Sequence, residues 1–217
     1  MNRSALLSIL LAAAALAQEP GAVSATRNAT ADVPGLPRVL LIGDSISGGY
    51  DAPVRKLLAG KANVRHAGDI GGPSSNGVAH LDKIPSGHWD VVTFNYGLHD
   101  MKLDTGSHQV EVSQYEANLK IIADALHKTG AKLIWVTTTP VPTGKLAPKR
   151  ERADAPLYNE AAARALKGKI DAVCDLYTAV LPRESELQLK ENVHFTPAGY
   201  DFLAQQLAAS IEAQLKR

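Results

Sequence analysis

A serine and a histidine near opposite ends of the sequence could act as a nucleophile and its base. Ser45 lies in residues 43–47, Gly-Asp-Ser-Ile-Ser, directly after an apolar run. His194 lies in residues 191–197, Glu-Asn-Val-His-Phe-Thr-Pro, just before a predicted C-terminal helix. A serine hydroxyl becomes a useful nucleophile at neutral pH when a general base stands within hydrogen-bond distance. The two segments therefore predict nucleophilic catalysis, in which Ser45 attacks and His194 accepts its proton.

An acid stands three residues before this histidine. A loop turn of that length could bring Glu191 against the imidazole, where a carboxylate fixes the tautomer and stabilises the cation. Each feature alone has an ordinary interpretation, since Ser, Asp and Gly are common turn residues and a histidine before a helix often caps it. A lipase-type Gly-x-Ser-x-Gly elbow is absent, because Ser47 stands two residues after Ser45. The coincidence of serine, histidine and acid favours the catalytic interpretation.

Strand-like and helix-like patterns alternate from Pro37 onward, which is typical of a parallel sheet covered by helices on both faces. The glycine pair at 48 and 49 is expected to turn the backbone sharply before the first helix. The loop 139–152 follows a strand, at the edge where open α/β sheets bind ligands, so it either touches substrate or is a solvated connection. The predicted strands are 38–42, 62–66, 90–95, 132–137 and 170–173, and the clearest predicted helices are 114–128, 153–166 and 197–215.

Four segments, in order along the chain, resemble the sequence blocks of the SGNH/GDSL hydrolases. The first block resembles residues 43–47, and the second, a glycine after the second strand, is best matched by Gly71. The third block, Gly-x-Asn-Asp, resembles residues 97–100, Gly-Leu-His-Asp, and the last, Asp-x-x-His, resembles residues 191–194. Four blocks that match in the same order, spread over nearly the whole chain after its N-terminal segment, are more specific evidence for the family than any single block.

The resemblance implies a flavodoxin-like three-layer α/β/α fold with a five-stranded parallel sheet, and acyl-ester hydrolysis without metal or organic cofactor. It also implies that the N–H groups of Ser45 and Gly71 and the third-block side chain hold the oxyanion. His99 stands where the family usually has Asn, and Glu191 where it usually has Asp. A neutral imidazole can donate one hydrogen bond, so His99 could replace the amide. Alternatively, Asn95 supplies the amide and His99 binds substrate.

The N-terminus has the pattern of an export signal. Arg3 precedes a mostly apolar run that ends at Ala17, too short to span a bilayer comfortably, since about 20 residues are needed. Residues 1–17 are therefore predicted to be a signal peptide cleaved after Ala17, which makes the protein secreted or periplasmic, although a retained anchor is the alternative. Residues 18–37 are expected to form a flexible linker, and residues 38–217 the hydrolase domain.

Composition restricts the partners. One of the 23 basic residues lies in the predicted signal, which leaves 22 basic against 22 acidic side chains and no electrostatic pull toward nucleic acid or membrane. Cys174 is the only cysteine and is expected to be a buried, inert thiol.

Export and the absence of an apolar lid favour a small-molecule or glycan acyl ester, most simply an acetylated carbohydrate, as substrate. A lysophospholipase or thioesterase, or a non-catalytic glycan-binding protein on the same scaffold, are the alternatives, and the oligomeric state stays open.

Overall fold

The computed structural model describes residues 31–104 and 106–216, so the predicted signal peptide and most of the predicted linker lie outside the described residues. Its centre is a five-stranded sheet in the order β2-β1-β3-β6-β7, in which every neighbouring pair is parallel. The predicted parallel α/β class is confirmed. The strands are β1 (Arg38–Ile42), β2 (Asn63–Ala67), β3 (Val91–Phe94), β6 (Lys132–Val136) and β7 (Ala172–Cys174).

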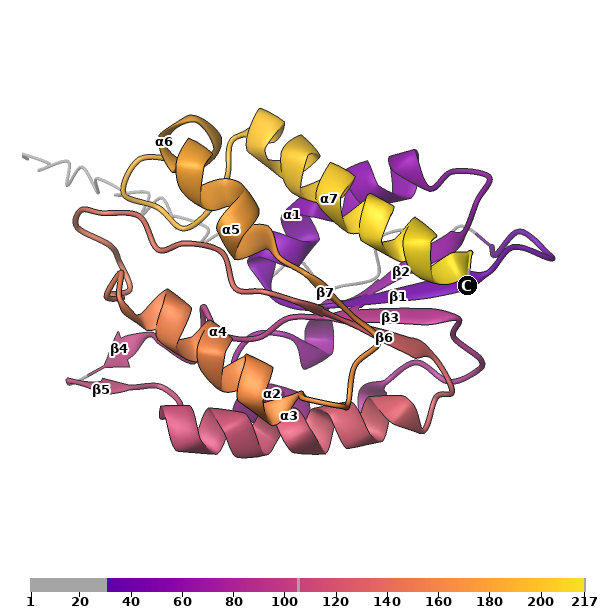
Figure 1. Ribbon diagram of the computed structural model, residues 1–217, viewed down its shortest axis with the longest axis horizontal. Helices are drawn as coiled ribbons and strands as arrows, with labels where there is room; N and C mark the ends of the chain where they lie inside the picture. The colour runs from indigo at the N-terminus through magenta and orange to yellow at the C-terminus, as the bar shows by residue number, and fades with distance from the viewer. Residues whose placement is uncertain (1–30, 105, 217) are drawn as a thin grey trace, which may run out of the picture.

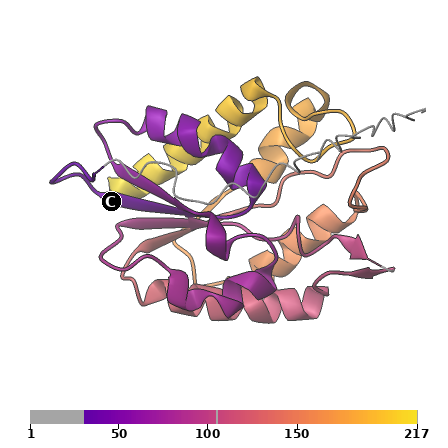
Figure 2. The same ribbon diagram turned by 180° about the vertical axis from the view of Figure 1, so that it is seen from behind.

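Helices cover both faces of the sheet, which gives the predicted three layers (Figures 1 and 2). One face carries α1 (Ser45–Leu57), α5 (Leu176–Val180), α6 (Glu184–Leu187) and α7 (Pro197–Leu215). The other carries α2 (Ser74–Ala79), α3 (Val112–His127) and α4 (Asp154–Ala165). Short elements complete the described chain: the hairpin β4 (Leu103–Asp104) and β5 (Ser107–His108), and the 3₁₀ turns η1 (Gly68–Ile70), η2 (Leu81–Lys83) and η3 (Leu181–Arg183).

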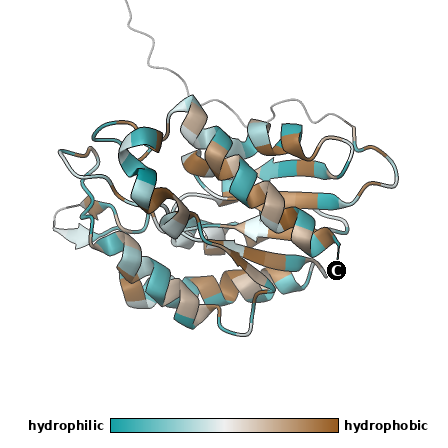
Figure 3. Cartoon of the chain, turned by 45° about the horizontal axis from the view of Figure 1, so that its top comes forward, coloured by the Kyte–Doolittle hydropathy of each residue, from teal (hydrophilic) through white to brown (hydrophobic). Residues whose placement is uncertain are grey.

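The central strands are apolar because both of their faces are covered (Figure 3). Phe94 of β3 and Trp135 of β6 meet edge to face, with ring centroids 5.2 Å apart. The predicted strand bounds agree to within two residues. The largest difference is at β7, which pairs with β6 from Ala172 because the side chain of Asp171 accepts the N–H of Leu133 in place of a ladder bond.

The strand order brings distant loops to one edge. Strand β1 pairs with β2 on one side and β3 on the other, so the chain reverses direction across the sheet between them. Ligands of open α/β sheets bind outside the carboxyl ends of the strands at such a switch point. The segments that follow β1, β2 and β3 all emerge there. The three resembling blocks that carry Ser45, Gly71 and His99 therefore meet at this edge.

Packing of α7 on α1 brings the last block to the same place. Gly49 of α1 lies against the ring of Tyr200 of α7, so closely that a Cβ on Gly49 would be 2.1 Å from that ring. The prediction of a sharp turn at residues 48 and 49 is wrong, because the helix already begins at Ser45 and both glycines lie inside it. Gly49 instead permits the close approach of the two helices.

The end of the predicted linker is attached to the sheet edge. Asp32 forms ion pairs with Arg38 and Arg65, at 3.0 and 2.6 Å, and the N–H of Val33 donates to the side chain of Asn63. The described residues before β1 thus pack with the domain.

In the described part of the chain, no helix has both the length and the apolar character needed to cross a membrane.

Candidate active site

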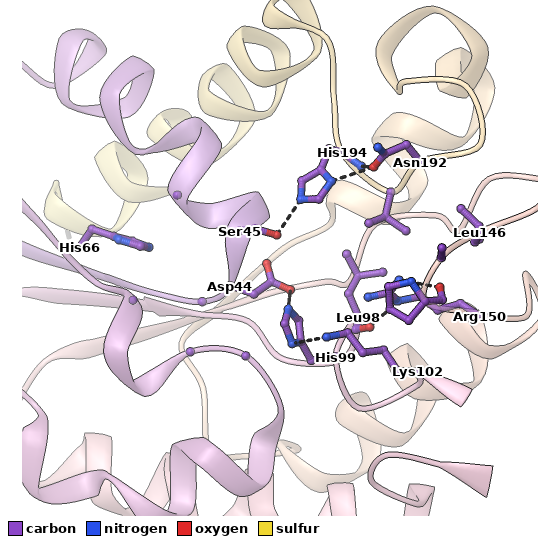
Figure 4. A pocket seen from close by; sticks show the side chains of 18 of the residues that line it. Asp44, Ser45, His66, Leu98, His99, Lys102, Leu146, Arg150, Asn192 and His194 are labelled. Carbon is purple, nitrogen blue, oxygen red and sulfur yellow. Dashed lines mark hydrogen bonds and ion pairs between the residues drawn. The ribbon is translucent and has the colours of Figure 1, made fainter. Parts of the chain in front are cut away.

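A pocket of about 680 Å³ opens at the carboxyl edge of the sheet (Figure 4). Its walls are the loops after β1, β2 and β3, part of the loop 139–152, and the loop before α7. All but one of the residues predicted from the sequence line it: Ser45, Gly71, His99, Glu191 and His194. Asn95 does not. The loop 139–152 contributes Leu146, Ala147, Pro148 and Arg150 to the wall.

Ser45 and His194 are 149 residues apart in the chain, and their side chains are in hydrogen-bond contact. The distance from Ser45 Oγ to His194 Nε2 is 2.9 Å (Figure 4). Ser45 is exposed and is the first residue of α1, where backbone N–H groups lack an intrahelical acceptor and the helix dipole is positive. The turn is held by Asp44, whose side chain caps the helix by accepting from Ile46 N at 2.9 Å, and by Ser47, whose hydroxyl donates to the Asp44 carbonyl.

The other nitrogen of His194 contacts Asn192. His194 Nδ1 lies 2.7 Å from Asn192 Oδ1, and the same oxygen accepts the backbone N–H of His194 at 3.0 Å. An amide oxygen only accepts, so Nδ1 carries the proton and Nε2 is left to accept from Ser45. Sequence reasoning missed Asn192. The available signal was local, because Asn side chains commonly bond the backbone two residues further on.

Glu191 is not the partner of His194, which corrects the sequence-based expectation. Its backbone has a left-handed φ of 51° and its side chain is exposed. The side chain lies over Gly144, where an added Cβ would come within 2.4 Å of Glu191 Cγ. The left-handed turn directs the carboxylate to that loop, and Asn192 takes the place beside the imidazole.

His99 lies between Asp44 and Lys102 on the pocket wall (Figure 4). Its Nδ1 accepts from Lys102 Nζ at 2.9 Å, which leaves the proton on Nε2. Nε2 is 3.9 Å from Asp44 Oδ2, too far for a hydrogen bond. Burial lowers the pKa of His99, and the charges of Lys102 and Arg150 lower it further, against the opposite effect of Asp44. His99 therefore presents a neutral imidazole with a free N–H.

The two remaining predicted oxyanion groups are engaged elsewhere. The amide of Asn95 donates to the Val136 carbonyl at 2.8 Å and to Thr138 Oγ1 at 3.3 Å, inside the fold, so the alternative that Asn95 faces the pocket does not fit. The N–H of Gly71 donates to the Gly68 carbonyl at 3.0 Å, which closes η1. Gly71 nevertheless packs directly against the carbonyl of Gly43, next to the serine turn.

Asp100, the last residue of the third block, anchors the loop that carries His99. Its Oδ1 accepts the N–H of Ser74 at 2.8 Å at the start of α2, whereas its buried Oδ2 has no partner in the described part of the chain. Burial raises the pKa of Asp100 to about 6, and the contacts with Ser74 oppose this only in part. The carboxyl is therefore protonated in the folded protein at mildly acidic pH.

This raised pKa predicts a pH dependence of stability. Between about pH 4 and pH 6 the folded protein holds a proton on Asp100 that the unfolded chain has lost, so the free energy of unfolding falls as the pH rises through that window. The total loss is about 3 kcal/mol by pH 7. Asp100→Asn should remove this slope, as measured by urea unfolding from pH 4 to pH 7. Equal slopes in the two proteins would contradict the prediction.

The remaining candidate groups have structural partners. His66 Nε2 lies 2.7 Å from the hydroxyl of Ser47, which in turn donates to the turn that carries Ser45. Cys174 is buried, and burial raises the pKa of its thiol to about 12, which is the inert state expected for it. Within the described residues, no three His, Cys, Asp or Glu side chains gather in a way that could hold a metal ion.

Comparison with known proteins identifies a family and solved structures with the same fold. Residues 41–202 match the model of the GDSL-like lipase/acylhydrolase family. A lipase/acylhydrolase from Enterococcus faecalis superposes with a TM-score of 0.70 at 22% identity, over 82% of this chain and 97% of that one. An acetyl xylan esterase from Geobacillus stearothermophilus gives 0.67 at 20% identity, over 81% and 94% of the two chains. A further acetyl xylan esterase, AlAXEase, gives 0.64 at 20% identity, over 80% and 99%.

A comparison with curated protein sequences gave no match. These three solved structures are each below 25% identical to this chain and show the fold. The family model covers well over half of the chain, from within β1 to within α7. On this ground, and with the expected blocks gathered at one pocket, the chain belongs to the GDSL-like lipase/acylhydrolase family of SGNH hydrolases and is an ester hydrolase.

Proposed function

We propose that this protein removes short acyl groups, acetyl foremost, from carbohydrate esters by serine catalysis. The observation that carries the proposal is the 2.9 Å contact between Ser45 Oγ and His194 Nε2 in the lining of the pocket. This is the distance at which a base can take the hydroxyl proton as the nucleophile attacks. Ser45 is the proposed nucleophile and His194 the general base.

The proposed reaction has two halves. Ser45 Oγ attacks the carbonyl carbon of the ester and passes its proton to His194 Nε2. The tetrahedral intermediate collapses by breaking the bond to the alcohol, which leaves with the proton from His194. Water then attacks the acyl-enzyme and gives a proton to His194. The second tetrahedral intermediate collapses as His194 returns that proton to Ser45 Oγ, which releases the carboxylic acid and restores the free enzyme.

Two donors are proposed for the oxyanion: the N–H of Ser45 at the start of α1, and the free Nε2–H of neutral His99. Donors aimed at developing charge contribute about 3–4 kcal/mol each to lowering a barrier. The N–H of Gly71 joins them only if it leaves the Gly68 carbonyl when substrate binds. His99 thus takes the part that the family usually gives to Asn.

Two features support a short acyl group on a polar alcohol. Only five of the lining residues have apolar side chains, Leu98, Leu146, Ala147, Pro148 and Val193, while the other lining residues are polar, charged or glycine. A long acyl chain needs a larger apolar surface to bind. Two of the structural relatives are acetyl xylan esterases. Export through residues 1–17 remains part of the proposal, since a secreted or periplasmic enzyme meets such glycans.

The test combines labelling with a substrate screen. A fluorophosphonate should label the protein at Ser45, found by peptide mass spectrometry, and labelling should be lost in His194→Ala. Acetylated xylan, pectin and peptidoglycan fragments are then assayed for released acetate. Absence of the label at Ser45 would favour a non-catalytic glycan-binding protein. Faster hydrolysis of long-chain lysophospholipids or thioesters than of any acetylated glycan would favour a lysophospholipase or thioesterase.

The partner of His194 gives a separate prediction. Asn192→Ala should lower kcat on para-nitrophenyl acetate about 100-fold, because Nδ1 loses the acceptor that selects the active tautomer. Asn192→Asp should raise kcat about tenfold, because a carboxylate also stabilises the imidazolium ion.

The neighbouring acid is the matched control. Glu191→Ala removes a carboxylate that lies over Gly144, so kcat should stay within about twofold of wild type. If Glu191→Ala were the slower variant, Glu191 would turn toward His194 during turnover and the assignment of Asn192 would be wrong.

A further inference from the structure

Two cations without a carboxylate partner form one wall of the pocket. Lys102 follows β3 and Arg150 belongs to the loop 139–152, and both line the pocket on the side of His99 (Figure 4). Arg150 is only 8% exposed, and Lys102 is half-buried. In the described part of the chain, no carboxylate lies within ion-pair distance of either.

The contacts that hold these side chains are with neutral groups. Arg150 Nε donates to the Leu98 carbonyl at 2.6 Å, and its Nη1 donates to the Pro148 carbonyl at 3.3 Å. Lys102 Nζ donates to the neutral imidazole of His99. These bonds orient the cations but do not neutralise them. The other N–H groups of both side chains have no acceptor among the described residues.

The acids of the pocket compensate these charges only in part. The buried carboxylate of Asp44 raises the pKa of both cations, but it forms no ion pair with either and caps α1 through Oδ1. Asp69 and Glu191 are exposed, and water solvates them. Burial lowers the pKa of Lys102 and of Arg150, and the charge of Arg150 lowers that of Lys102 further. Two cations thus face one buried carboxylate, so the net charge of this part of the pocket is positive, and a buried cation without an ion-pair partner is costly to keep.

We propose that Lys102 and Arg150 bind a carboxylate that the ester substrate itself carries. The inference rests on the proposed ester hydrolysis and narrows its substrate to anionic esters. A guanidinium and an ammonium side by side offer a carboxylate several charge-assisted hydrogen bonds. The carboxylate has two sources: the alcohol, as in an acetylated acidic sugar, or the acyl group, as in the half-ester of a dicarboxylic acid.

Two pairs of esters separate these sources. For the alcohol side, kcat/KM is compared for para-acetoxybenzoate and para-methylphenyl acetate. For the acyl side, it is compared for mono-para-nitrophenyl succinate and para-nitrophenyl butyrate. We expect the anionic member of at least one pair to be preferred by about tenfold, and added NaCl to reduce that preference. Equal kcat/KM within both pairs would overturn the proposal, whereas failure to hydrolyse any ester would overturn the proposed function.

Variants assign the preference to this wall. Lys102→Gln and Arg150→Gln should each reduce the anionic-to-neutral ratio about tenfold, whatever they do to turnover of the neutral ester through His99 or Leu98. Lys149→Gln is the matched control, because Lys149 is 67% exposed, pairs with Glu151 at 2.8 Å and lies outside the pocket lining. Its ratio should equal that of wild type. An unchanged ratio in Lys102→Gln would remove Lys102 from the site.

Binding can be measured without turnover. Calorimetry with Ser45→Ala should give a lower Kd for the preferred anionic ester than for its neutral counterpart, and Lys102→Gln added to that variant should abolish the difference. The result does not depend on catalysis. If the anionic ester binds more tightly than the neutral ester but wild type hydrolyses neither, the anion site stands and the proposed esterase activity is wrong. Equal Kd values for the two esters would mean that there is no anion site.

Discussion

Ser45→Ala is expected to lower kcat on para-nitrophenyl acetate by about 10⁴- to 10⁶-fold. Among the described residues, the Ser45 hydroxyl is the only group in hydrogen-bond contact with His194 Nε2. In the alanine variant the imidazole can activate only water. Residues that act as a unit lose their effects together, so the double variant Ser45→Ala/His194→Ala should be no slower than either single variant.

Stopped assays over hours measure such low rates, and thermal unfolding checks that the variants fold. Ser45 is exposed, so its truncation should change the free energy of unfolding by no more than about 0.5 kcal/mol. Equal turnover by wild type and Ser45→Ala, in protein shown to be folded, would end the assignment of Ser45 as nucleophile. Additive losses in the double variant would mean that His194 acts on another group.

Gly71→Ala is expected to be more damaging than the addition of a methyl group at any other glycine that lines the pocket. A Cβ at this position would lie 1.9 Å from the Gly43 carbonyl oxygen and 2.4 Å from its carbon. Both contacts are with backbone, so no side chain can rotate away to relieve them. The β1–α1 turn that carries Ser45 must move, and a displacement of about 1 Å at a reacting group costs about 10²-fold in rate.

The stability of Gly71→Ala should fall by about 3 kcal/mol or more, measured by urea unfolding, since overpacking against fixed backbone is costly. Gly48→Ala is the control in the same pocket. Its Cβ would be 4.0 Å from the His66 ring, an ordinary contact, and it lies inside α1, where alanine gains up to about 1 kcal/mol over glycine. If Gly71→Ala were as stable and active as wild type, the close approach of these two backbone segments would be wrong.

Periodic features of the sequence predicted the fold well. The apolar runs of β1, β3 and β6 and the helical pattern of α3 involve many residues that all favour one structure, so errors at single positions leave the outcome unchanged. The bounds of α7 agree with the prediction at both ends, and Thr196 and Pro197 are strong signals for its start. The error at residues 48 and 49 arose because glycine permits a sharp turn without requiring one.

The identity of each contact in the pocket depended on single dihedral angles and on segments far apart in the chain. From spacing alone, Glu191 and Asn192 are both near enough to His194, and a left-handed φ at Glu191 decides between them. Likewise, no local pattern relates Lys102 to Arg150, which meet only because the loops after β3 and β6 leave the sheet at the same edge. Local pattern thus determined the layers of the fold, because those follow from regular structure, and it identified Ser45 and His194 as a candidate pair that the packing of α7 on α1 then brings into contact. Tertiary structure alone decided what touches His194, which oxyanion donors are free and where the buried positive charge lies, because those depend on how irregular loops pack against one another.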